Sequence, residues 1–251
     1  VKAGHKVDLF HFVYKGQKLP SPIEVNNVLF DGTNSFENVF CCYFPNSIKF
    51  PGHYLFNSYG YSKWIYEIIK ERNEYDFIYS KGFSAWKLLK KKKLLKSNTK
   101  IGLKFHGYEM FQYAPNFRVK LKHYMLRPFV RSLNLKADFV FSYGGKITDI
   151  IHSLGVSTRK VIEIPTAIDS SWLKNEIYLP KNKIKFLYVG RYERRKGIDE
   201  INQSILKLST SNNNLEFHFM GPIPEKKQLK VKNIKTVYYG LIQDISVKKS
   251  V

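Results

Sequence analysis

The chain has 251 residues, 43% of them hydrophobic and 16% aromatic, so it can form one large or two ordinary folded domains and is not a disordered protein. No apolar run approaches the roughly 18 residues of a membrane span, and the adjacent Cys41 and Cys42 indicate reduced thiols in a cytoplasmic compartment. The formal net charge of +22 indicates an anionic partner, but Lys outnumbers Arg 34 to 8, which disfavours base reading, so no specific nucleic acid is expected.

The first two thirds of the chain alternate between strand and helix patterns. Apolar runs rich in β-branched and aromatic residues predict strands at 6–14, 39–44, 75–80, 100–107, 138–144 and 160–165. Apolar residues at helical spacing predict helices at 61–74, 83–95, 115–136 and 146–155, the third interrupted at Pro128. Strands of this kind, separated by helices, indicate a parallel sheet that is covered on both faces.

A polar stretch at 169–182 breaks this alternation, which then starts again. Strands are predicted at 184–190, 215–221 and 235–240, with a helix at 198–210 and a short helix near 225–230. The predicted fold class is therefore α/β, with a first Rossmann-like domain at 1–168, a linker at 169–182 and a second Rossmann-like domain at 183–251. Three strands are few for such a domain, so the second one is expected to be incomplete.

The turn after the strand at 184–190 concentrates positive charge where an anion could bind. Ligands of open α/β sheets bind beyond the carboxyl ends of the strands, and helix N-termini favour anions. Gly190 allows close approach to the backbone, Arg191 can bind two phosphate oxygens, and Lys196 can add a second charge. An ordinary solvated basic turn is the alternative interpretation, because the chain has no G-x-G-x-x-G motif and no P-loop.

A second candidate lies at the end of the strand at 100–107. His106 can bind a sugar hydroxyl or move a proton near neutral pH, and Gly107 is expected to leave space beside it. Glu109 is a candidate acceptor contact, or an ordinary acid at a helix N-terminus. A structural histidine is the alternative for His106. The histidines and cysteines lack metal-ligand spacing, so no metal site is expected.

Two lysine-rich segments, 86–95 and 116–136, lie in a stretch with 15 basic residues and a single acid between Phe77 and Ala137. The first places Trp86 and several leucines among five lysines. Such a segment can lie in the headgroup region of an anionic membrane, with its apolar residues inserted and its lysines near phosphate. A surface helix with a solvated charged face is the alternative.

The order of the motifs resembles that of retaining glycosyltransferases of family 4, which have the GT-B fold and the "group 1" glycosyltransferase domain. The matching stretches are GHKV (4–7), HGYE (106–109), ADFVFS (137–142), IPTAID (164–169), VGRYERRKGID (189–199) and FHFMGP (217–222). The resemblance implies that Arg191 and Lys196, beside Gly190, bind the diphosphate of a nucleotide-sugar donor. It implies that His106 lies near the transferred sugar, that no metal or other cofactor is needed, and that configuration is retained.

The sequence departs from the family pattern in three places. The Gly-rich first loop would precede Val1, Thr166 and Ala167 stand where Asn-Gly is usual, and the Glu–seven residues–Glu motif would follow Val251. The chain is therefore expected to be a fragment with little or no transferase activity of its own, from a full-length parent that is active.

Three functional hypotheses follow. The first is a glycosyltransferase that moves sugar to a glycan or lipid-linked acceptor in bacterial surface polysaccharide synthesis, such as that of lipopolysaccharide, located in the cytoplasm and peripherally at the inner face of the membrane. The second is a non-catalytic basic module that binds anionic membrane or nucleic acid, which the net charge of +22 would support. The third is a degenerate gene product without a function.

Overall fold

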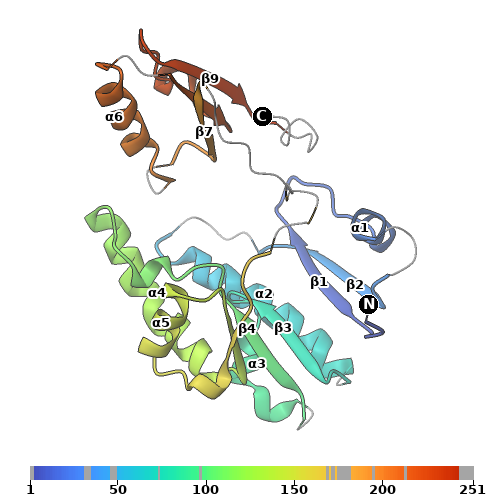
Figure 1. The fold of residues 1–251 in the computed structure, drawn as a ribbon. Coiled ribbons are helices and arrows are strands. Elements are labelled where there is room, and N and C mark those ends of the chain that lie inside the picture. Colours follow the sequence, from blue (N-terminus) through green and yellow to red (C-terminus); the bar gives the residue numbers. More distant parts are fainter. Residues whose placement is uncertain are drawn as a thin grey trace. The chain divides into compact units, whose positions relative to one another are not determined.

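A computed structural model of the chain describes residues 3–30, 35–45, 50–72, 74–95, 98–167, 170, 173, 182–193, 196–211 and 214–242. The chain divides into two compact units, Val1–Thr166 (unit 1) and Ala167–Val251 (unit 2) (Figure 1). Each unit has its own parallel strands and its own apolar core. Most of the expected linker at 169–182 lies outside the described residues.

The strands of unit 1 form two parallel sheets. The first contains β1 (Asp8–Val13) and β2 (Asn38–Tyr43). The second has the order β3-β4-β5-β6, with β3 (Phe77–Lys81), β4 (Lys100–Lys104), β5 (Phe139–Ser142) and β6 (Val161–Glu163). All neighbouring strands pair in parallel. The predicted strands and their parallel arrangement are confirmed, and the carboxyl ends of β3 to β6 lie at one edge of the sheet.

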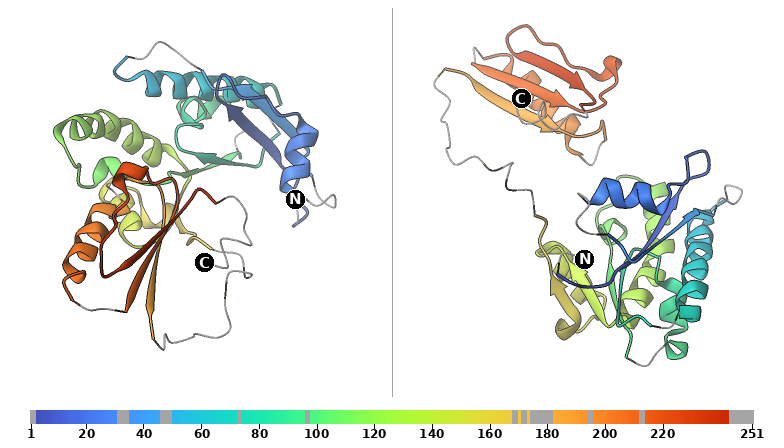
Figure 2. Two further views of the ribbon diagram at one scale, coloured as in Figure 1. Left: turned by 90° about the horizontal axis from the view of Figure 1, so that it is seen from above. Right: turned by 90° about the vertical axis from the view of Figure 1, so that its right-hand side faces the viewer.

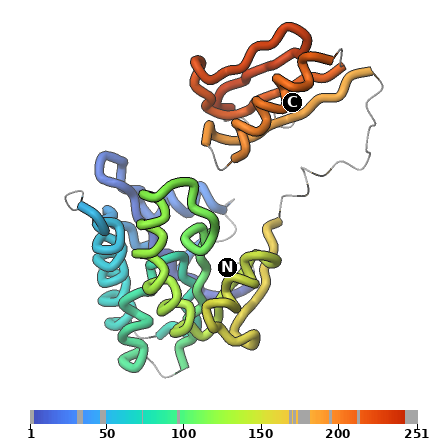
Figure 3. Tube along the Cα trace, turned by 90° about the vertical axis from the view of Figure 1, so that its left-hand side faces the viewer, coloured from blue at the N-terminus to red at the C-terminus, as the bar shows by residue number. Residues whose placement is uncertain are grey.

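Five helices belong to unit 1: α1 (Pro22–Leu29), α2 (His53–Arg72), α3 (Trp86–Lys90), α4 (Phe117–Lys136) and α5 (Lys146–Ser153). Helices α2, α4 and α5 run side by side on one side of the sheet strands (Figure 3). The core lies between these layers, where Ile101 and Leu103 of β4 and Val140 of β5 are fully buried. Burial of such side chains provides most of the stabilisation of a layered α/β unit.

The other face of the four-stranded sheet is more open than the sequence predicted. Phe77 and Tyr79 of β3 and Ile162 of β6 keep 44%, 49% and 36% of their surface exposed. The expectation of a sheet covered on both faces is therefore wrong for the described part of unit 1, because α2, α4 and α5 all lie on the opposite side (Figure 3). The rings of Phe77 and Phe141 close over Gly102, where an added Cβ would lie 2.7 and 2.5 Å from their atoms.

Helix α4 continues through Pro128, so the predicted interruption is wrong. The Asn116 side chain caps its first turn by accepting from the backbone N–H of Val119 at 3.0 Å. Proline removes one intrahelical hydrogen bond, but tertiary packing can offset this loss. Beyond the proline, Val130 and Leu133 are buried in the core of unit 1 and hold the second half of the helix in place.

The segment at 86–95 does not have the apolar surface expected of a membrane-binding helix. It forms α3 and a short 3-10 helix at Lys92–Leu94. Trp86, Leu88 and Leu89 are 7%, 1% and 5% exposed because they pack in the core of unit 1. These three apolar side chains are therefore not available for insertion in a membrane, and Leu94, which is 59% exposed, is the apolar side chain of 86–95 that faces solvent together with the lysines. Membrane contact through 86–95 stays a prediction.

Helix α1 was not predicted, although its start signal is present in the sequence. Ser21 and Glu24 form a capping box, in which the Ser21 side chain accepts from the Glu24 backbone N–H and the Glu24 side chain accepts from that of Ser21. Pro22 occupies the first turn, where its missing N–H has no helical partner in any case. No helix in the described ranges is long and apolar enough to cross a membrane.

Unit 2 has a three-stranded parallel sheet of order β7-β8-β9. Its elements are β7 (Ile184–Val189), α6 (Ile198–Leu208), β8 (Leu215–Met220), a 3-10 helix (Glu225–Lys227) in place of the expected short helix, and β9 (Lys235–Gly240). Helix α6 packs on one face of this sheet (Figure 2). Ile198 and Ile205 of the helix are buried against Phe217 and Phe219 of the central strand.

Candidate functional site

Glycines follow or end all three strands of unit 2 at their carboxyl ends. The Gly190 backbone N–H donates to the Met220 carbonyl at 2.9 Å, and that of Gly221 donates to the Gly240 carbonyl at 2.8 Å. Gly221 has φ +140°, and a Cβ added to it would lie 2.0 Å from the Gly190 carbonyl oxygen. Only glycine fits there, so this edge of the sheet presents backbone without side chains.

The sequence-predicted Arg191 and Lys196 lie on the turn that leaves this edge. Both side chains are exposed, and the backbone N–H of Lys196 donates to the Glu193 carbonyl at 2.9 Å. The Tyr188 hydroxyl donates to the Arg191 carbonyl at 2.8 Å and fixes the start of the turn. The turn therefore carries two cations beside bare backbone at the carboxyl edge of a parallel sheet, a place where such sheets bind ligands. Arg194 and Arg195 lie outside the described residues.

Arg191 has an acidic neighbour that sequence reasoning did not consider. Its Nη2 atom lies 3.0 Å from the Glu193 Oε1 atom, and the Arg191 side chain is 67% exposed. A solvent-exposed ion pair of this kind contributes little to stability, so an anion with more charge can displace the Glu193 carboxylate. The nearby carboxylate also raises the pKa of the Tyr188 hydroxyl, although burial is the larger cause.

The N-terminus of α6 contributes less to anion binding than its position suggests. Gly197 precedes the helix with φ +73°, in the left-handed region that glycine tolerates. Asp199 and Glu200 occupy the first turn and already interact favourably with the positive end of the helix dipole. Among the described residues of this turn, Arg191 and Lys196 are therefore the main candidates for anion binding.

In unit 1, His106 follows β4 at the carboxyl edge of the four-stranded sheet and its side chain is exposed. Its Nδ1 atom lies 2.9 Å from the hydroxyl oxygen of Tyr143, which follows the neighbouring strand β5. The Lys104 Nζ atom lies 4.0 Å from the centre of the Tyr143 ring, a cation–π contact. Tyr143 thus orients the imidazole through Nδ1, and Nε2 is the atom that can meet a substrate.

A buried hydrogen-bond network fixes the loop after His106 to α4. The Tyr108 hydroxyl donates to Asn134 Oδ1 at 2.7 Å, and Asn134 Nδ2 donates to the Val130 carbonyl at 2.7 Å. Tyr108 and Asn134 are both fully buried, and burial raises the pKa of the Tyr108 hydroxyl well above its usual value. A satisfied buried network of this kind makes the loop rigid, so the backbone around His106 is preorganised.

Glu109 lies close to Gly107 on the same loop and begins a 3-10 helix at Glu109–Phe111. A Cβ added to Gly107 would lie 2.7 Å from the Glu109 Oε1 atom. The space that the sequence was expected to leave beside His106 is therefore bordered by the Glu109 carboxylate. Gly107 makes room for this carboxylate, which keeps Glu109 at the same sheet edge as His106.

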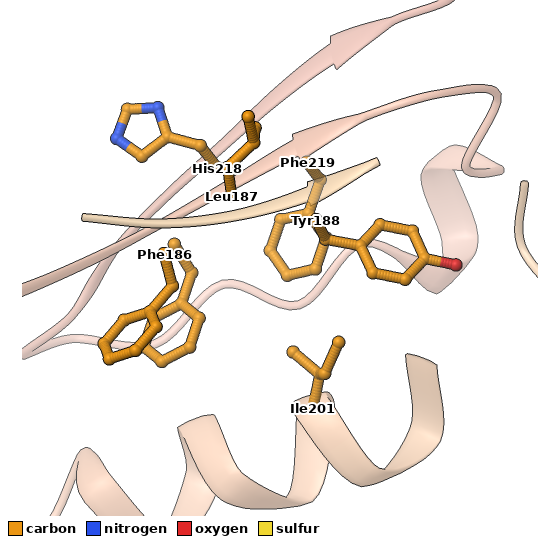
Figure 4. A pocket seen from close by; sticks show the side chains of 7 residues that line it. Phe186, Leu187, Tyr188, Ile201, His218 and Phe219 are labelled. Carbon is orange, nitrogen blue, oxygen red and sulfur yellow. The ribbon is translucent and has the colours of Figure 1, made fainter. Parts of the chain in front are cut away.

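An apolar cavity of about 180 Å³ lies elsewhere in unit 2, between β7 and α6. Figure 4 shows Phe186 and Tyr188 of β7, Phe219 of β8 and Ile201 of α6 around it, whereas Leu187 and His218 point to the other side of the sheet. Its lining is aromatic and aliphatic, without converging charged groups. The cavity is a gap in the core beneath the edge strand and is not suited to a phosphate.

The described residues contain no group of three or more His, Cys, Asp or Glu side chains that could hold a metal ion. Cys41 and Cys42 are free thiols, and burial, together with its neighbour Cys41, raises the pKa of Cys42 to about 11. Cys42 is therefore a neutral and weakly nucleophilic group near pH 7. That the chain needs no metal or other cofactor stays a prediction from the sequence.

Tyr143, Glu193 and Gly221 were missed by sequence reasoning. A signal existed for Tyr143, because it follows the strand next to β4 and the carboxyl ends of neighbouring parallel strands meet at one edge. Gly221 stands in the FHFMGP stretch, but its contact with Gly190 depends on the strand register. Glu193 lies two residues from Arg191, and only the folded turn shows that they pair.

No protein-family model and no curated protein match the sequence. Solved structures do match. The lipopolysaccharide outer core galactosyltransferase WaaB in its apo form is 14% identical with a TM-score of 0.55, over 94% of this chain and 69% of WaaB. Apo OtsA is 11% identical with a TM-score of 0.60, over 98% of this chain and 69% of OtsA. Anabaena HepE in complex with UDP and glucose is 14% identical with a TM-score of 0.50, over 96% of this chain and 71% of HepE.

At these identities the matches show the fold. They span both units of the chain, and together with the parallel sheets they confirm the predicted α/β, GT-B-like architecture. Membership of family 4 and retention of configuration go beyond the fold and remain predictions. The residues at the sheet edges are the part of the structure from which a function can be argued.

Proposed function

We propose that the chain is a glycosyltransferase that takes a sugar from a nucleotide-diphosphate donor and transfers it to a glycan or lipid-linked acceptor. The observation that carries this proposal is the basic turn of unit 2, where Arg191 and Lys196 leave a sheet edge of bare glycine backbone. The fold adds support, because it is shared with a galactosyltransferase and with a protein bound to UDP and glucose.

In this proposal Arg191 and Lys196 bind the donor diphosphate. The guanidinium exchanges the Glu193 carboxylate for two phosphate oxygens, which it can bind in a bidentate manner. As the bond between sugar and phosphate breaks, negative charge grows on the leaving diphosphate, and both cations stabilise it more strongly than in the ground state. The diphosphate approaches the backbone of Gly190, which has no side chain.

His106 acts on the sugar in this proposal. Because Tyr143 occupies its Nδ1 atom, Nε2 forms the hydrogen bond to a sugar hydroxyl. Glu109, at the same sheet edge, accepts a hydrogen bond from the acceptor. The resemblance to family 4 adds retention of configuration and a role in bacterial surface polysaccharide synthesis in the cytoplasm, for which the stereochemistry of the product is the first test.

Calorimetric titration of the full chain with UDP, GDP and ADP tests the donor site. At least one of these should bind, and Arg191→Ala and Lys196→Ala should each weaken its binding by about tenfold to 100-fold, the usual range for a hydrogen bond to a charged group. Glu193→Gln should strengthen binding a few-fold, because it removes the carboxylate that competes for Arg191.

Lys207→Ala is the matched control, since it removes one positive charge from the other end of α6. It should leave the affinity within about twofold of the unchanged chain, as expected for a cation remote from the ligand. The proposal is overturned if none of the nucleotides binds, or if Arg191→Ala and Lys196→Ala bind as tightly as Lys207→Ala.

A further inference from the structure

We propose that the outer face of α4 docks unit 1 on the surface of a bilayer that contains anionic lipid. This inference rests on α4 alone and does not depend on the proposed function. The helix carries an exposed row, the α4 stripe, formed by Phe117, Leu121, Tyr124 and Pro128. The first three are 77%, 53% and 52% exposed.

The spacing of the α4 stripe places it on one side of the helix. Its members are separated by four, three and four residues, which is the spacing of a single helical face. The opposite face contains Val130, Leu133 and Asn134, all buried in unit 1. Helix α4 therefore has two apolar faces, and the core of unit 1 covers one of them.

Cations flank the α4 stripe on both sides. With 3.6 residues per turn, Arg118 lies beside the stripe on one side, and Lys120 and Arg131 lie beside it on the other. Lys122 lies further round the helix, on the same side as Arg118. The sequence has no Asp or Glu from residue 110 to residue 137. Among the described residues, no acidic side chain forms an ion pair with Arg118, Lys120 or Lys122.

An anionic bilayer surface fits both properties of this face. Exposed phenylalanine and leucine side chains gain free energy by entering the acyl boundary, and tyrosine is favoured at the headgroup level. The flanking cations then lie at the depth of the lipid phosphates, where each contributes about 1 kcal/mol. Tyr113, in the loop just before α4, is a further exposed aromatic side chain, with 91% of its area accessible.

Other occupants fit less well. A nucleic acid would neutralise the cations but would leave the aliphatic Leu121 without an apolar environment. A second copy of the chain in a twofold contact would place like charges of the two α4 helices against each other. A second copy remains a distinguishable outcome of the experiment below.

The test is flotation of the full chain with vesicles of phosphatidylcholine, either alone or with one third phosphatidylglycerol. The chain should bind the anionic vesicles at least roughly tenfold more strongly, and high salt should remove most of this difference. Replacement of Phe117, Leu121 and Tyr124 by serine should lower binding by roughly tenfold or more, because the inserted apolar surface is lost. Circular dichroism and the melting temperature should not change, since all three side chains are exposed.

Helix α1 offers a control for exposed apolar surface. Ile23, Val28 and Leu29 are 70%, 83% and 55% exposed, and this helix has an acid in its first turn and no basic residue in its last turn. Their replacement by serine should leave vesicle binding within about twofold, because surface without flanking cations is not favoured at an anionic interface. Equal loss in the α1 and α4 variants would mean unspecific adsorption and would overturn the proposal.

The charges have a matched control as well. Arg118, Lys120 and Lys122 changed to glutamine should lower binding to anionic vesicles by about two orders of magnitude. Lys90, Lys91 and Lys93 changed to glutamine remove the same charge from the exposed side of the segment at 86–95 and should have a much smaller effect. Equal effects of the two sets would indicate attraction by net charge alone and would overturn docking through α4.

Two further outcomes would also overturn the proposal. One is that the unchanged chain fails to bind anionic vesicles. The other is that analytical ultracentrifugation finds a dimer, without vesicle binding, which the triple serine variant of α4 converts to a monomer. Nucleotide titration of the same α4 variants separates the two proposals, because the donor site on unit 2 should bind normally even where vesicle binding is lost.

Discussion

The two lysine-rich segments of unit 1, 86–95 and 116–136, both combine apolar residues with cations but differ in how many of their apolar side chains are exposed. In the first, Trp86, Leu88 and Leu89 are buried in the core. In the second, Phe117 and Leu121 are 77% and 53% exposed. Composition shows that a segment combines leucines with lysines, but the packing partners decide which apolar residues remain available for another molecule.

The lysines of the two segments differ in the same way. Lys87 and Lys90 lie over the ring of Tyr59 at 5.8 and 5.0 Å, and Lys92 forms an ion pair with Asp138. These cations interact with unit 1 itself, whereas Arg118, Lys120 and Lys122 form no ion pair with the described residues. The α3 segment is therefore a structural part of the unit, and α4 is the part with a surface for binding.

The largest effect should be the difference between two leucine truncations, one in each segment. Leu88→Ala should lower the free energy of unfolding by about 2 to 5 kcal/mol, because Leu88 is 1% exposed and the change leaves a cavity. Leu121→Ala should change it by less than about 0.5 kcal/mol, as for other exposed sites. Urea denaturation followed by circular dichroism measures both, and similar losses at the two positions would contradict the distinction between the segments.

Much of the fold could be predicted from the sequence because strand runs and helical spacing are local signals. The strands at 8–13, 100–104 and 215–220 follow directly from their apolar runs. The continuation of α4 through Pro128 could not be predicted, because it depends on the packing of Val130 and Leu133 beyond the proline. Burial of the leucines in α3 likewise depends on tertiary neighbours, and the local sequence pattern does not identify these neighbours.

A smaller effect should follow from removing the ion pair that anchors the segment at 86–95. The Asp138 carboxylate accepts from Lys92 and, at 2.8 Å, from the backbone N–H of Ile101. Burial opposes its ionisation, but these two partners outweigh burial and keep the pKa of Asp138 below its usual value. Asp138→Asn should lower the free energy of unfolding by about 1 to 2 kcal/mol near pH 7, after allowance for solvent screening.

The sign of the pH dependence follows from the lowered pKa of Asp138. The unfolded chain binds a proton at this carboxyl near pH 4, and the folded chain does so only at lower pH. The stabilisation is therefore complete above about pH 4 and is lost as the pH falls through the folded pKa. Urea denaturation of the unchanged chain and Asp138→Asn should give converging stabilities below pH 4, and a constant difference would contradict this assignment.

The candidate site residues could be located from the sequence, but their partners could not. His106 and Arg191 follow apolar strand runs, and the carboxyl ends of such strands are identifiable without a structure. The pairing of His106 with Tyr143 depends on the alignment of β4 with β5, and the pairing of Arg191 with Glu193 depends on the turn conformation. These partners change which atoms can meet a substrate, so they determine the chemistry that the residues can perform.

The smallest effect should come from Pro128→Ala. This change tests whether the stability of α4 and its binding to vesicles can vary independently. Alanine would restore the backbone N–H that proline lacks, and it has the highest helix propensity, so the free energy of unfolding should rise by up to about 1 kcal/mol. The change lies within the α4 stripe but leaves its larger side chains, Phe117, Leu121 and Tyr124, in place. Vesicle binding should therefore stay within about twofold, since the inserted side chains and the flanking cations are the same. If stability and vesicle binding change in parallel, membrane binding depends on the rigidity of α4, and insertion of the α4 stripe no longer explains it.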